Sequence, residues 1–344
     1  VQVQMSDAAA RPLALTLGEP AGIGPDLALA VWHRRRELDV PPFYLIGDAD
    51  FLGQRARMLG LDIAIEAATP AAASRIFTQA LPVVQLPAKV TARPGEPDAT
   101  SAAAAIGSID AAVADVLAGR ATAVVTNPIN KHVLYRAGFT DPGHTEYLAR
   151  LCQRATGKTM MPVMLLWSPE LAVVPVTIHV ALKDAVTQLS TQLIVDTGRI
   201  VARDMEKWFG LKRPRLAVAG LNPHAGEDGT LGREDIEIVA PAVAALKAEG
   251  IDARGPLPAD TMFHAAARAT YDVALGMYHD QVLIPIKTLA FEHGVNVTLG
   301  LPFLRTSPDH GTAFDLAGTG RADPSSLIAA LKLAARLTAR TPVA

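Results

Sequence analysis

Three short apolar segments of this chain each end at a histidine. They are LAVVPVTIH, which ends at His179, RLAVAGLNPH, which ends at His224, and YDVALGMYH, which ends at His279. Short segments rich in Val, Leu and Ala are typical of buried β-strands. Ligands of open α/β sheets bind beyond the carboxyl ends of the strands, so three parallel strands would bring these imidazoles to one edge. Three imidazoles that leave coordination positions open are typical of a catalytic divalent metal site.

Two acidic residues accompany these histidines. Asp280 follows His279 directly, and ligating imidazoles usually donate their other N–H group to an oxygen, so we expect Asp280 to orient that ring. Asp260, in PLPADTMF, lies at a strand end or in a loop. Three roles remain open for it: support of a metal ligand, proton relay, or helix capping.

A second group of residues is suited to an anionic ligand. Lys287, Asn296 and Arg305 are evenly spaced in a segment rich in Gly and Pro. Cations in an apolar setting need an anionic partner, which is either a carboxylate of the protein or a group of the ligand. His144 and Thr145, in GHTE, open a predicted helix. Thr145 is a candidate helix cap, and His144 is either a turn residue or a ligand contact.

The first glycine-rich loop does not match a dinucleotide fingerprint. In GEPAGIGPD (18–26), a GxGxxG pattern starting at Gly22 would need glycine where Leu27 stands. Pro25 also removes an N–H donor that a phosphate cradle would use. A tight structural turn and a ligand-facing loop both remain open here. The polar strand end TNPINK (126–131) suggests ligand contacts.

Composition limits the function classes. The chain has 344 residues, of which 50% are hydrophobic and 19% charged, with a formal net charge of -2. These values indicate a compact soluble protein without the basic stripe of a nucleic-acid-binding protein. Cys152 is the only cysteine, so we expect a buried thiol and no disulfide. No signal peptide or apolar stretch of transmembrane length is seen, and we expect a cytoplasmic protein.

Strand-like and helix-like segments alternate along the chain, which predicts an α/β fold. We expect strands at 13–18, 43–48 and 122–128, helices at 25–36, 99–118 and 325–340, and a long loop or hairpin at 82–97. Such alternation implies a mostly parallel sheet covered by helices on both faces. Residues 1–12 are expected to form a flexible extension. The last helix should pack against an early part of the chain, which makes the arrangement discontinuous.

Several motifs together resemble one enzyme family. The chain is similar to the 4-hydroxythreonine-4-phosphate dehydrogenases of bacterial vitamin B6 synthesis over residues 13–340. The motifs that carry the resemblance are GEPAGIGPD (18–26), TNPINK (126–131), GHTEYL (143–148), TIHVALKD (177–184), GLNPHAGEDG (220–229), GPLPADTMF (255–263), MYHDQ (277–281) and GVNVTLGLPFLRTSPDHGTAFDLAG (294–318).

The resemblance implies an α/β/α fold with two lobes, similar to that of isocitrate and isopropylmalate dehydrogenases, with the active site in the cleft between the lobes. The lobes would comprise 13–136 plus 303–344, and 137–302. It also implies a homodimer with its active site at the interface, so the metal ligands need not all come from one chain and His279 could complete the partner's site.

The resemblance further implies the reaction and its residues. A divalent metal (Zn, Co, Mn or Mg) would be held by His179, His224 and His279. The substrate contacts would be His144, Thr145, Lys287, Asn296 and Arg305, with Asp260 and Lys287 as candidate acid or base. NAD or NADP, bound without a GxGxxG loop, would oxidise 4-phosphohydroxy-L-threonine to a 3-oxo acid that decarboxylates to 3-amino-2-oxopropyl phosphate.

Other functions remain open on the sequence. A related dehydrogenase could act on a phosphorylated four-carbon sugar acid or a dihydrodiol carboxylate, because such relatives keep the three histidines. A metal-dependent hydrolase would use the open metal position to activate water, and substrate-dependent cofactor reduction would exclude it. A non-enzymatic phosphometabolite-binding protein would not need open coordination positions.

Overall fold

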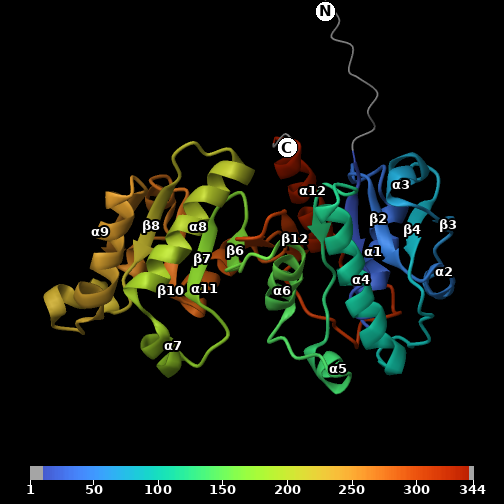
Figure 1. Cartoon of the computed structure of the whole chain (residues 1–344), viewed down its shortest axis with the longest axis horizontal. Coiled ribbons are helices and arrows are strands. Elements are labelled where there is room, and N and C mark those ends of the chain that lie inside the picture. Colours follow the sequence, from blue (N-terminus) through green and yellow to red (C-terminus); the bar gives the residue numbers. More distant parts are fainter. Residues whose placement is uncertain (1–10, 341–344) are drawn as a thin grey trace, which may run out of the picture. The chain divides into compact units, whose positions relative to one another are not determined.

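The computed structural model describes residues 11–340, so nearly all of the extension expected at 1–12 lies outside the described residues. The chain divides into two compact units (Figure 1). Unit 1 contains the described residues up to Met160 together with Pro302–Thr338, and unit 2 contains Met161–Leu301. The first boundary lies later than the expected one at 136/137, because α6 (His144–Thr156), like α5 (Lys131–Arg136) before it, packs against α4 (Ala99–Leu117) of unit 1.

The sheet of unit 1 is parallel throughout its described pairings. Its strand order is β3-β4-β2-β1-β5-β12. The strands are β1 (Leu13–Thr16), β2 (Phe43–Gly47), β3 (Ile65–Ala67), β4 (Leu81–Gln85), β5 (Val124–Val125) and β12 (Arg305–Pro308). β1, β2, β5 and β12 are buried at every residue, as expected for strands covered on both faces.

The helices of unit 1 begin at local sequence signals. The side chain of Asp98 caps α4, and the side chain of Asp48 caps α2 (Ala49–Met58). The last helix, α12 (Ser325–Thr338), packs on β12, β5, β1 and α1 (Gly24–His33), so this helix does pack against an early part of the chain. The remaining helix of unit 1 is α3 (Pro70–Ile76).

Two expected segments of unit 1 differ from the structure. The region 82–97, expected as a loop or hairpin, begins with strand β4, which pairs in parallel with β2 and β3. The expected strand 122–128 is reduced to Val124–Val125. It ends early because the N–H group of Asn127 turns to the side-chain hydroxyl of Thr16, 3.2 Å away, instead of to a neighbouring backbone.

Helix α4 is long and apolar enough, by length and composition alone, to cross a membrane. Its apolar residues instead pack against β1 and β2, as those of a core helix do. Cys152, in α6, is buried as expected, and burial raises the pKa of its thiol to about 11.

The sheet of unit 2 has the order β11-β6-β7-β10-β8-β9. Strand β6 (Val163–Trp167) runs antiparallel to both of its neighbours, β11 (Val295–Leu299) and β7 (Ala172–Thr177). The pairs β7–β10, β10–β8 and β8–β9 are parallel, with β8 at Arg215–Ala219, β9 at Asp252–Leu257 and β10 at Val273–Tyr278. The sheet is therefore mixed, with one reversed strand among its described members.

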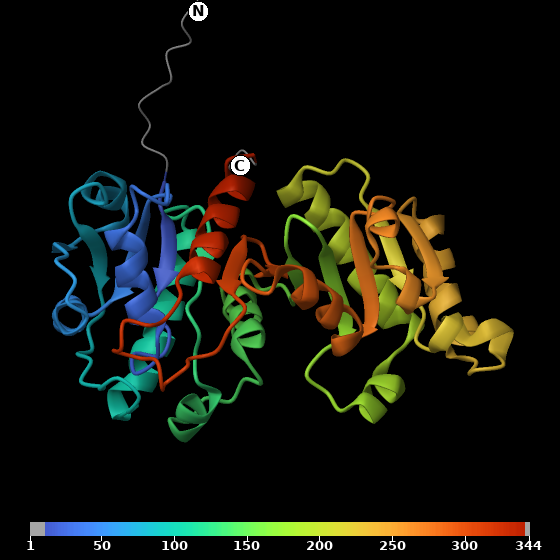
Figure 2. The same cartoon turned by 180° about the vertical axis from the view of Figure 1, so that it is seen from behind.

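Helices cover both faces of the unit 2 sheet. α8 (Thr191–Phe209) and α11 (His279–Ala290) lie on opposite faces (Figures 1 and 2). Val282, Leu283 and Ile286 of α11 join buried residues of β6, β7, β8 and β10 in one core cluster. The remaining elements are α7 (Leu182–Gln188), η1 (Pro223–Gly229), η2 (Asp235–Val239), α9 (Ala240–Ala248), η3 (Ala259–Thr261) and α10 (Ala265–Arg268).

Candidate active site

The three histidine-terminated segments form neighbouring parallel strands of unit 2. β10 lies between β7 and β8, with Tyr278 opposite Thr177 and Leu275 opposite Val218. Parallel strands bring their carboxyl ends to the same edge of a sheet. The segments that carry the three histidines therefore leave the sheet at one edge, and the expected strand arrangement is confirmed.

His179 and His279 lie close together at this edge. Their ring centroids are 5.6 Å apart, with 41° between the ring planes. Nδ1 of His279 lies 2.7 Å from Oδ1 of Asp280, the contact expected from the sequence. Because Nδ1 is engaged, Nε2 is the nitrogen of His279 that remains to bind a metal.

His224 begins an unusual turn. Residues 224–228 all have positive φ, with 53° at His224, 54° at Ala225, 81° at Gly226, 44° at Glu227 and 54° at Asp228. A left-handed conformation costs a non-glycine residue about 1–2 kcal/mol. His179 also has a positive φ, 52°. Two of the three predicted ligands thus sit on backbone that other contacts must hold in place.

Two side chains hold the His224 turn in place. Asp235, which is buried, accepts hydrogen bonds from the N–H groups of Leu221 (2.7 Å) and Asn222 (3.1 Å) and from Asn222 Nδ2 (3.1 Å). Gln281 donates through Nε2 to the carbonyl of Gly220 at 2.6 Å. The sequence reasoning missed both residues. Gln281 belongs to the MYHDQ motif, whereas nothing near Asp235 in the sequence signals this role.

The arrangement fits a metal only in part within one chain. In residues 11–340, no three His, Cys, Asp or Glu side chains are close enough to hold an ion together. His179 and His279 form a pair of nitrogen donors suited to a divalent metal. His224 instead lines a separate hollow of about 450 Å³ with Glu227, Asp228 and residues of η2, α9 and β9. The structure therefore brings two of the three predicted ligands together.

The other predicted residues of unit 2 lie in different surroundings. Lys287 is two helical turns after His279 on α11, and both line a hollow of about 450 Å³ with Asp280 and Leu283. Asn296, half-buried, lies on β11 opposite Leu166. Asp260 is exposed in η3, which packs against the turn that carries His224.

In unit 1 the structure brings Arg305 and His144 together. Arg305 is buried in β12, and burial lowers the pKa of its guanidinium to about 10. Burial, and then the positive charge of Arg305, hold the pKa of His144 well below its usual value. Nε2 of His144 is buried and has no hydrogen-bond partner among the described residues. A buried polar atom of this kind is one that a ligand could satisfy.

Helix α6 begins differently from the expectation. Its cap residue is Gly143, which makes no side-chain hydrogen bond, and His144 is the first helical residue. Thr145 lies in the first turn and is not the cap, so that prediction was wrong. The first turn of α6 thus carries two predicted ligand residues side by side.

The glycine-rich loop 18–24 encloses a side chain of the protein. Asn127 donates from Nδ2 to the carbonyl of Thr16 at 2.9 Å. A Cβ added at Gly18 would lie 2.7 Å from Cβ of Asn127, and one added at Gly24 would lie 3.1 Å from it. Gly18 and Gly24 are therefore required by close packing against Asn127, which supports a structural role for this turn.

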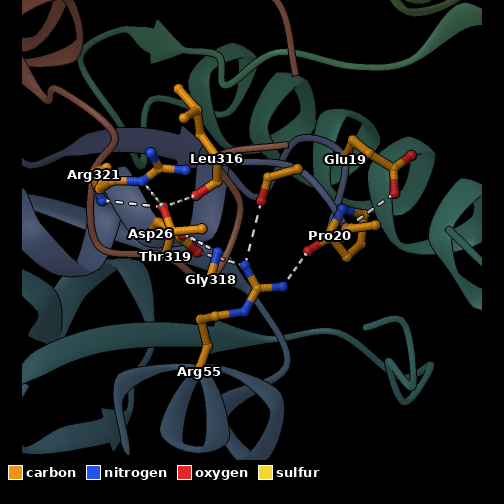
Figure 3. A network of polar contacts seen from close by, with 10 residues as sticks. Glu19, Pro20, Asp26, Arg55, Leu316, Gly318, Thr319 and Arg321 are labelled. Atoms are coloured by element: carbon orange, nitrogen blue, oxygen red, sulfur yellow. Dashed lines mark hydrogen bonds and ion pairs between the residues drawn. The ribbon is translucent and has the colours of Figure 1, made fainter. Parts of the chain in front are cut away.

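A buried ion pair also holds this loop in place (Figure 3). Arg55 of α2 donates to Oδ1 of Asp26 at 2.5 Å and to the carbonyl of Pro20 at 2.9 Å. Oδ2 of Asp26 accepts from the N–H group of Gly318 at 2.6 Å. Residues around 20, 55 and 318 are thus tied together, although they are far apart in the sequence.

Comparisons with known proteins agree with these features. The sequence profile described as "Pyridoxal phosphate biosynthetic protein PdxA" matches residues 39–334. A 4-hydroxythreonine-4-phosphate dehydrogenase of Bradyrhizobium diazoefficiens is 63% identical over 343 residues, which are 97% of this chain and 99% of that protein.

Solved structures are also similar to this chain. The 4-hydroxythreonine-4-phosphate dehydrogenase of Klebsiella pneumoniae is 37% identical, with a TM-score of 0.85 over 97% of this chain and 99% of that one. A terephthalate 1,2-cis-dihydrodiol dehydrogenase of Burkholderia xenovorans is 29% identical, with a TM-score of 0.65 over 97% of this chain and 100% of that one. The chain therefore belongs to the PdxA family of pyridoxal phosphate biosynthesis, the family of the 4-hydroxythreonine-4-phosphate dehydrogenases.

Proposed function

We propose that this oxidoreductase carries out the metal-dependent, NAD(P)-linked oxidation of 4-phosphohydroxy-L-threonine. The product is a 3-oxo acid that decarboxylates to 3-amino-2-oxopropyl phosphate, a step of pyridoxal 5'-phosphate synthesis. The observation that carries the proposal is the set of three parallel strands, β7, β10 and β8, each followed by a predicted histidine ligand. The relative at 63% identity bears the name of this activity.

His179, His224 and His279 are the residues that would hold the metal. The paired rings of His179 and His279 supply two nitrogen donors, and Asp280 fixes the ring of His279 through Nδ1. We propose that the set is completed with His224 in a homodimer, since the described chain alone does not gather all three. When bound, a divalent ion (Zn, Co, Mn or Mg) supplies Lewis-acid polarisation of the substrate alcohol.

The substrate's anionic groups are bound by cations and helix-start donors. On unit 1, Arg305 offers a buried positive charge, and His144 offers an unpaired, buried Nε2. Thr145 lies in the first turn of α6, where backbone N–H groups favour anions. On unit 2, the proposed contacts are Lys287 and Asn296. Holding the phosphate and carboxylate in this way fixes the carbon that is oxidised.

Two residues are candidates to move the proton of the alcohol. Lys287 shares a hollow with His279, which places it beside a proposed metal ligand. Asp260 is exposed next to the His224 turn. NAD or NADP accepts the hydride. Loop 18–24 lacks the GxGxxG pattern of a dinucleotide cradle, so no described residue is assigned to that cofactor.

Exposed apolar side chains of unit 2 support a homodimer. Leu182 is 62% exposed, Ile284 63% and Phe291 78%. Large apolar side chains gathered at a surface mark interaction sites. Leu182 follows His179 closely, and Ile284 lines the hollow of His279, so an interface here would adjoin the proposed metal ligands. The single, buried cysteine supports a cytoplasmic location.

A spectrophotometric assay tests the proposal. The purified enzyme is treated with a chelator and assayed with 4-phosphohydroxy-L-threonine and either NAD or NADP, before and after each metal is restored. We expect reduced cofactor to accumulate only after restoration. Cofactor reduction that survives chelation would disprove the metal dependence, and substrate turnover without reduction would indicate a hydrolase.

The same assay separates the alternative substrates. The Burkholderia structure makes a dihydrodiol carboxylate the specific competitor. We expect kcat/KM for 4-phosphohydroxy-L-threonine to exceed that for a dihydrodiol carboxylate or a phosphorylated four-carbon sugar acid, because the relative at 63% identity is named for activity on the phosphorylated threonine. The reverse order would reassign the substrate.

A further inference from the structure

The hydroxyl oxygen of Thr126 accepts two hydrogen bonds from one arginine. Nε of Arg305 lies 3.0 Å and Nη2 lies 2.6 Å from Thr126 Oγ1. Thr126 is 1% exposed and Arg305 5% exposed. The contact joins the end of β5 to the start of β12, which are neighbouring parallel strands. Within the buried core, this double contact fixes the plane of the guanidinium.

Thr126 is itself held rigidly. Its N–H group donates to the carbonyl of Thr306 at 3.0 Å. The next residue, Asn127, binds Thr16 through both its backbone N–H group and its side-chain amide. Oγ1 of Thr126 therefore has a fixed position between β1 and β12. A group that donates a hydrogen bond to it is held at that position.

A hydroxyl group suits this task because it is neutral. It orients a guanidinium and leaves the positive charge intact, whereas a carboxylate in the same place would cancel that charge. The charge of Arg305 is felt at His144, where it helps to lower the pKa of the imidazole. Because the guanidinium is a rigid planar fork, fixing the Nε/Nη2 edge also fixes the direction in which Nη1 extends.

We propose that Thr126 is the positioning residue for Arg305 and sets the orientation in which this arginine binds an anionic oxygen group of the substrate. The inference rests on the substrate-binding role proposed for Arg305 above. Thr126 acts through Arg305 and does not touch the substrate. Its loss should therefore weaken substrate binding more than it slows the chemical step.

The test compares Thr126→Val, which keeps the shape and removes the hydroxyl, with Thr126→Ser, which restores it. We expect the valine variant to raise KM for 4-phosphohydroxy-L-threonine by about tenfold or more, since hydrogen bonds to charged groups are the stronger kind. We expect kcat to change by less than about twofold, as for a contact made equally in the ground and transition states. The serine variant should bind close to wild type. Calorimetric Kd values measured without cofactor give a readout separate from turnover.

Thr306→Val is the matched control. Thr306 is a buried threonine of β12 whose hydroxyl donates to the carbonyl of Ala330 at 2.9 Å. Its replacement removes a buried hydroxyl from the same sheet without touching Arg305 side-chain contacts, so we expect reduced thermal stability and unchanged KM. If Thr126→Val does not fold, Thr126→Ala is measured by the same readouts.

The Arg305→Ala variant distinguishes failure of the positioning role of Thr126 from failure of the substrate-binding role of Arg305. If Arg305→Ala raises KM and Kd while Thr126→Val leaves both unchanged, the positioning role is disproved and the proposed function stands. If Arg305→Ala itself leaves both unchanged, the substrate role of Arg305 is wrong, and the inference falls with it. Equal effects of Thr126→Val and Thr306→Val would also overturn the inference, because they would indicate a general loss of core stability.

Discussion

The imidazole rings of His179 and His279 lie 5.6 Å apart at the carboxyl ends of the parallel strands β7 and β10. The two residues come from distant parts of the sequence, and only the pairing of these strands brings them together. Asp280 then holds one nitrogen of His279. This leaves the pair suited to share a divalent cation.

This pair predicts the metal content of variants. We expect His179→Ala, His224→Ala and His279→Ala each to lose most bound metal and turnover, because each removes one of three proposed nitrogen ligands. The metal that stays bound to each variant after gel filtration is measured by elemental mass spectrometry. His293→Ala, an exposed histidine after α11, is the control. Near wild-type turnover of His224→Ala with saturating metal would show that the metal role is wrong.

The hydrogen bonds of Asp235 predict an effect on both the free energy of unfolding and metal affinity. Asp235→Asn replaces one acceptor oxygen by a donor, so an N–H group of Leu221 or Asn222 loses its partner. We expect the free energy of unfolding to fall by about 1–3 kcal/mol and metal affinity to fall as the His224 turn loosens. Urea unfolding and metal titration check both. Glu237→Gln, an exposed residue of the same element η2, should change neither, and an Asp235→Asn variant with wild-type metal affinity would contradict the role of this carboxylate.

The buried carboxyl group of Glu19 should make the free energy of unfolding depend on pH. It is 1% exposed, and burial raises its pKa above the usual value. The folded state therefore keeps this proton to a higher pH than the unfolded state, so the contribution of Glu19 to stability falls as the pH rises above about 4.3. Glu19→Gln should remove this decline. Urea unfolding between pH 4 and 7 measures it.

The control for Glu19 is Glu66→Gln, because Glu66 is exposed. Its pH profile of unfolding should match that of the wild type. A Glu19→Gln profile parallel to the wild type would show that this carboxyl does not titrate differently in the folded and unfolded states.

His144 predicts a spectroscopic result. Burial and the charge of Arg305 lower its pKa, so its imidazole should become protonated only in more acidic solution than an ordinary histidine does. NMR of labelled histidine rings follows this titration. Arg305→Gln removes the charge and should move the pKa of His144 upward, toward but not up to its usual value, because the burial remains. Arg57→Gln, which removes an exposed arginine, should not move it. A His144 titration that is unchanged in Arg305→Gln would show that the two groups are not coupled.

The exposed apolar residues of unit 2 predict the oligomeric state. Analytical ultracentrifugation of the wild type should show a dimer, and Ile284→Asp should shift it toward monomer, because a buried charge at an interface is costly. Met58→Asp, an exposed apolar residue of unit 1, should leave it unchanged. We also expect monomeric variants to bind metal poorly. A dimer unaffected by Ile284→Asp would place the interface elsewhere.

The sequence by itself determined many of the elements and the edge of the unit 2 sheet at which the three predicted histidine ligands follow their strands. Periodicity and apolar runs located β1, β2, β7, β8, β10, α4 and α12 to within a few residues, because burial on both faces of a parallel sheet needs continuous apolar strands. It also identified the histidines that follow three of these strands. Local chemistry is enough for such inferences.

The tertiary structure alone decided which residues support the site. The sequence left loop 18–24 open between a turn and a cradle, and only the structure shows that Gly18 and Gly24 pack closely on Asn127, which belongs to another strand end. Nothing in the sequence indicated that Asp235 would hold the His224 turn or that Thr126 would hold Arg305. The contacts of Asn127 and Thr126 join segments far apart in the chain, whereas Asp235 folds back on the turn 14 residues before it. The physical reason is that strand pairing and loop folding select such partners, and residue type and local spacing carry no record of which segments become neighbours.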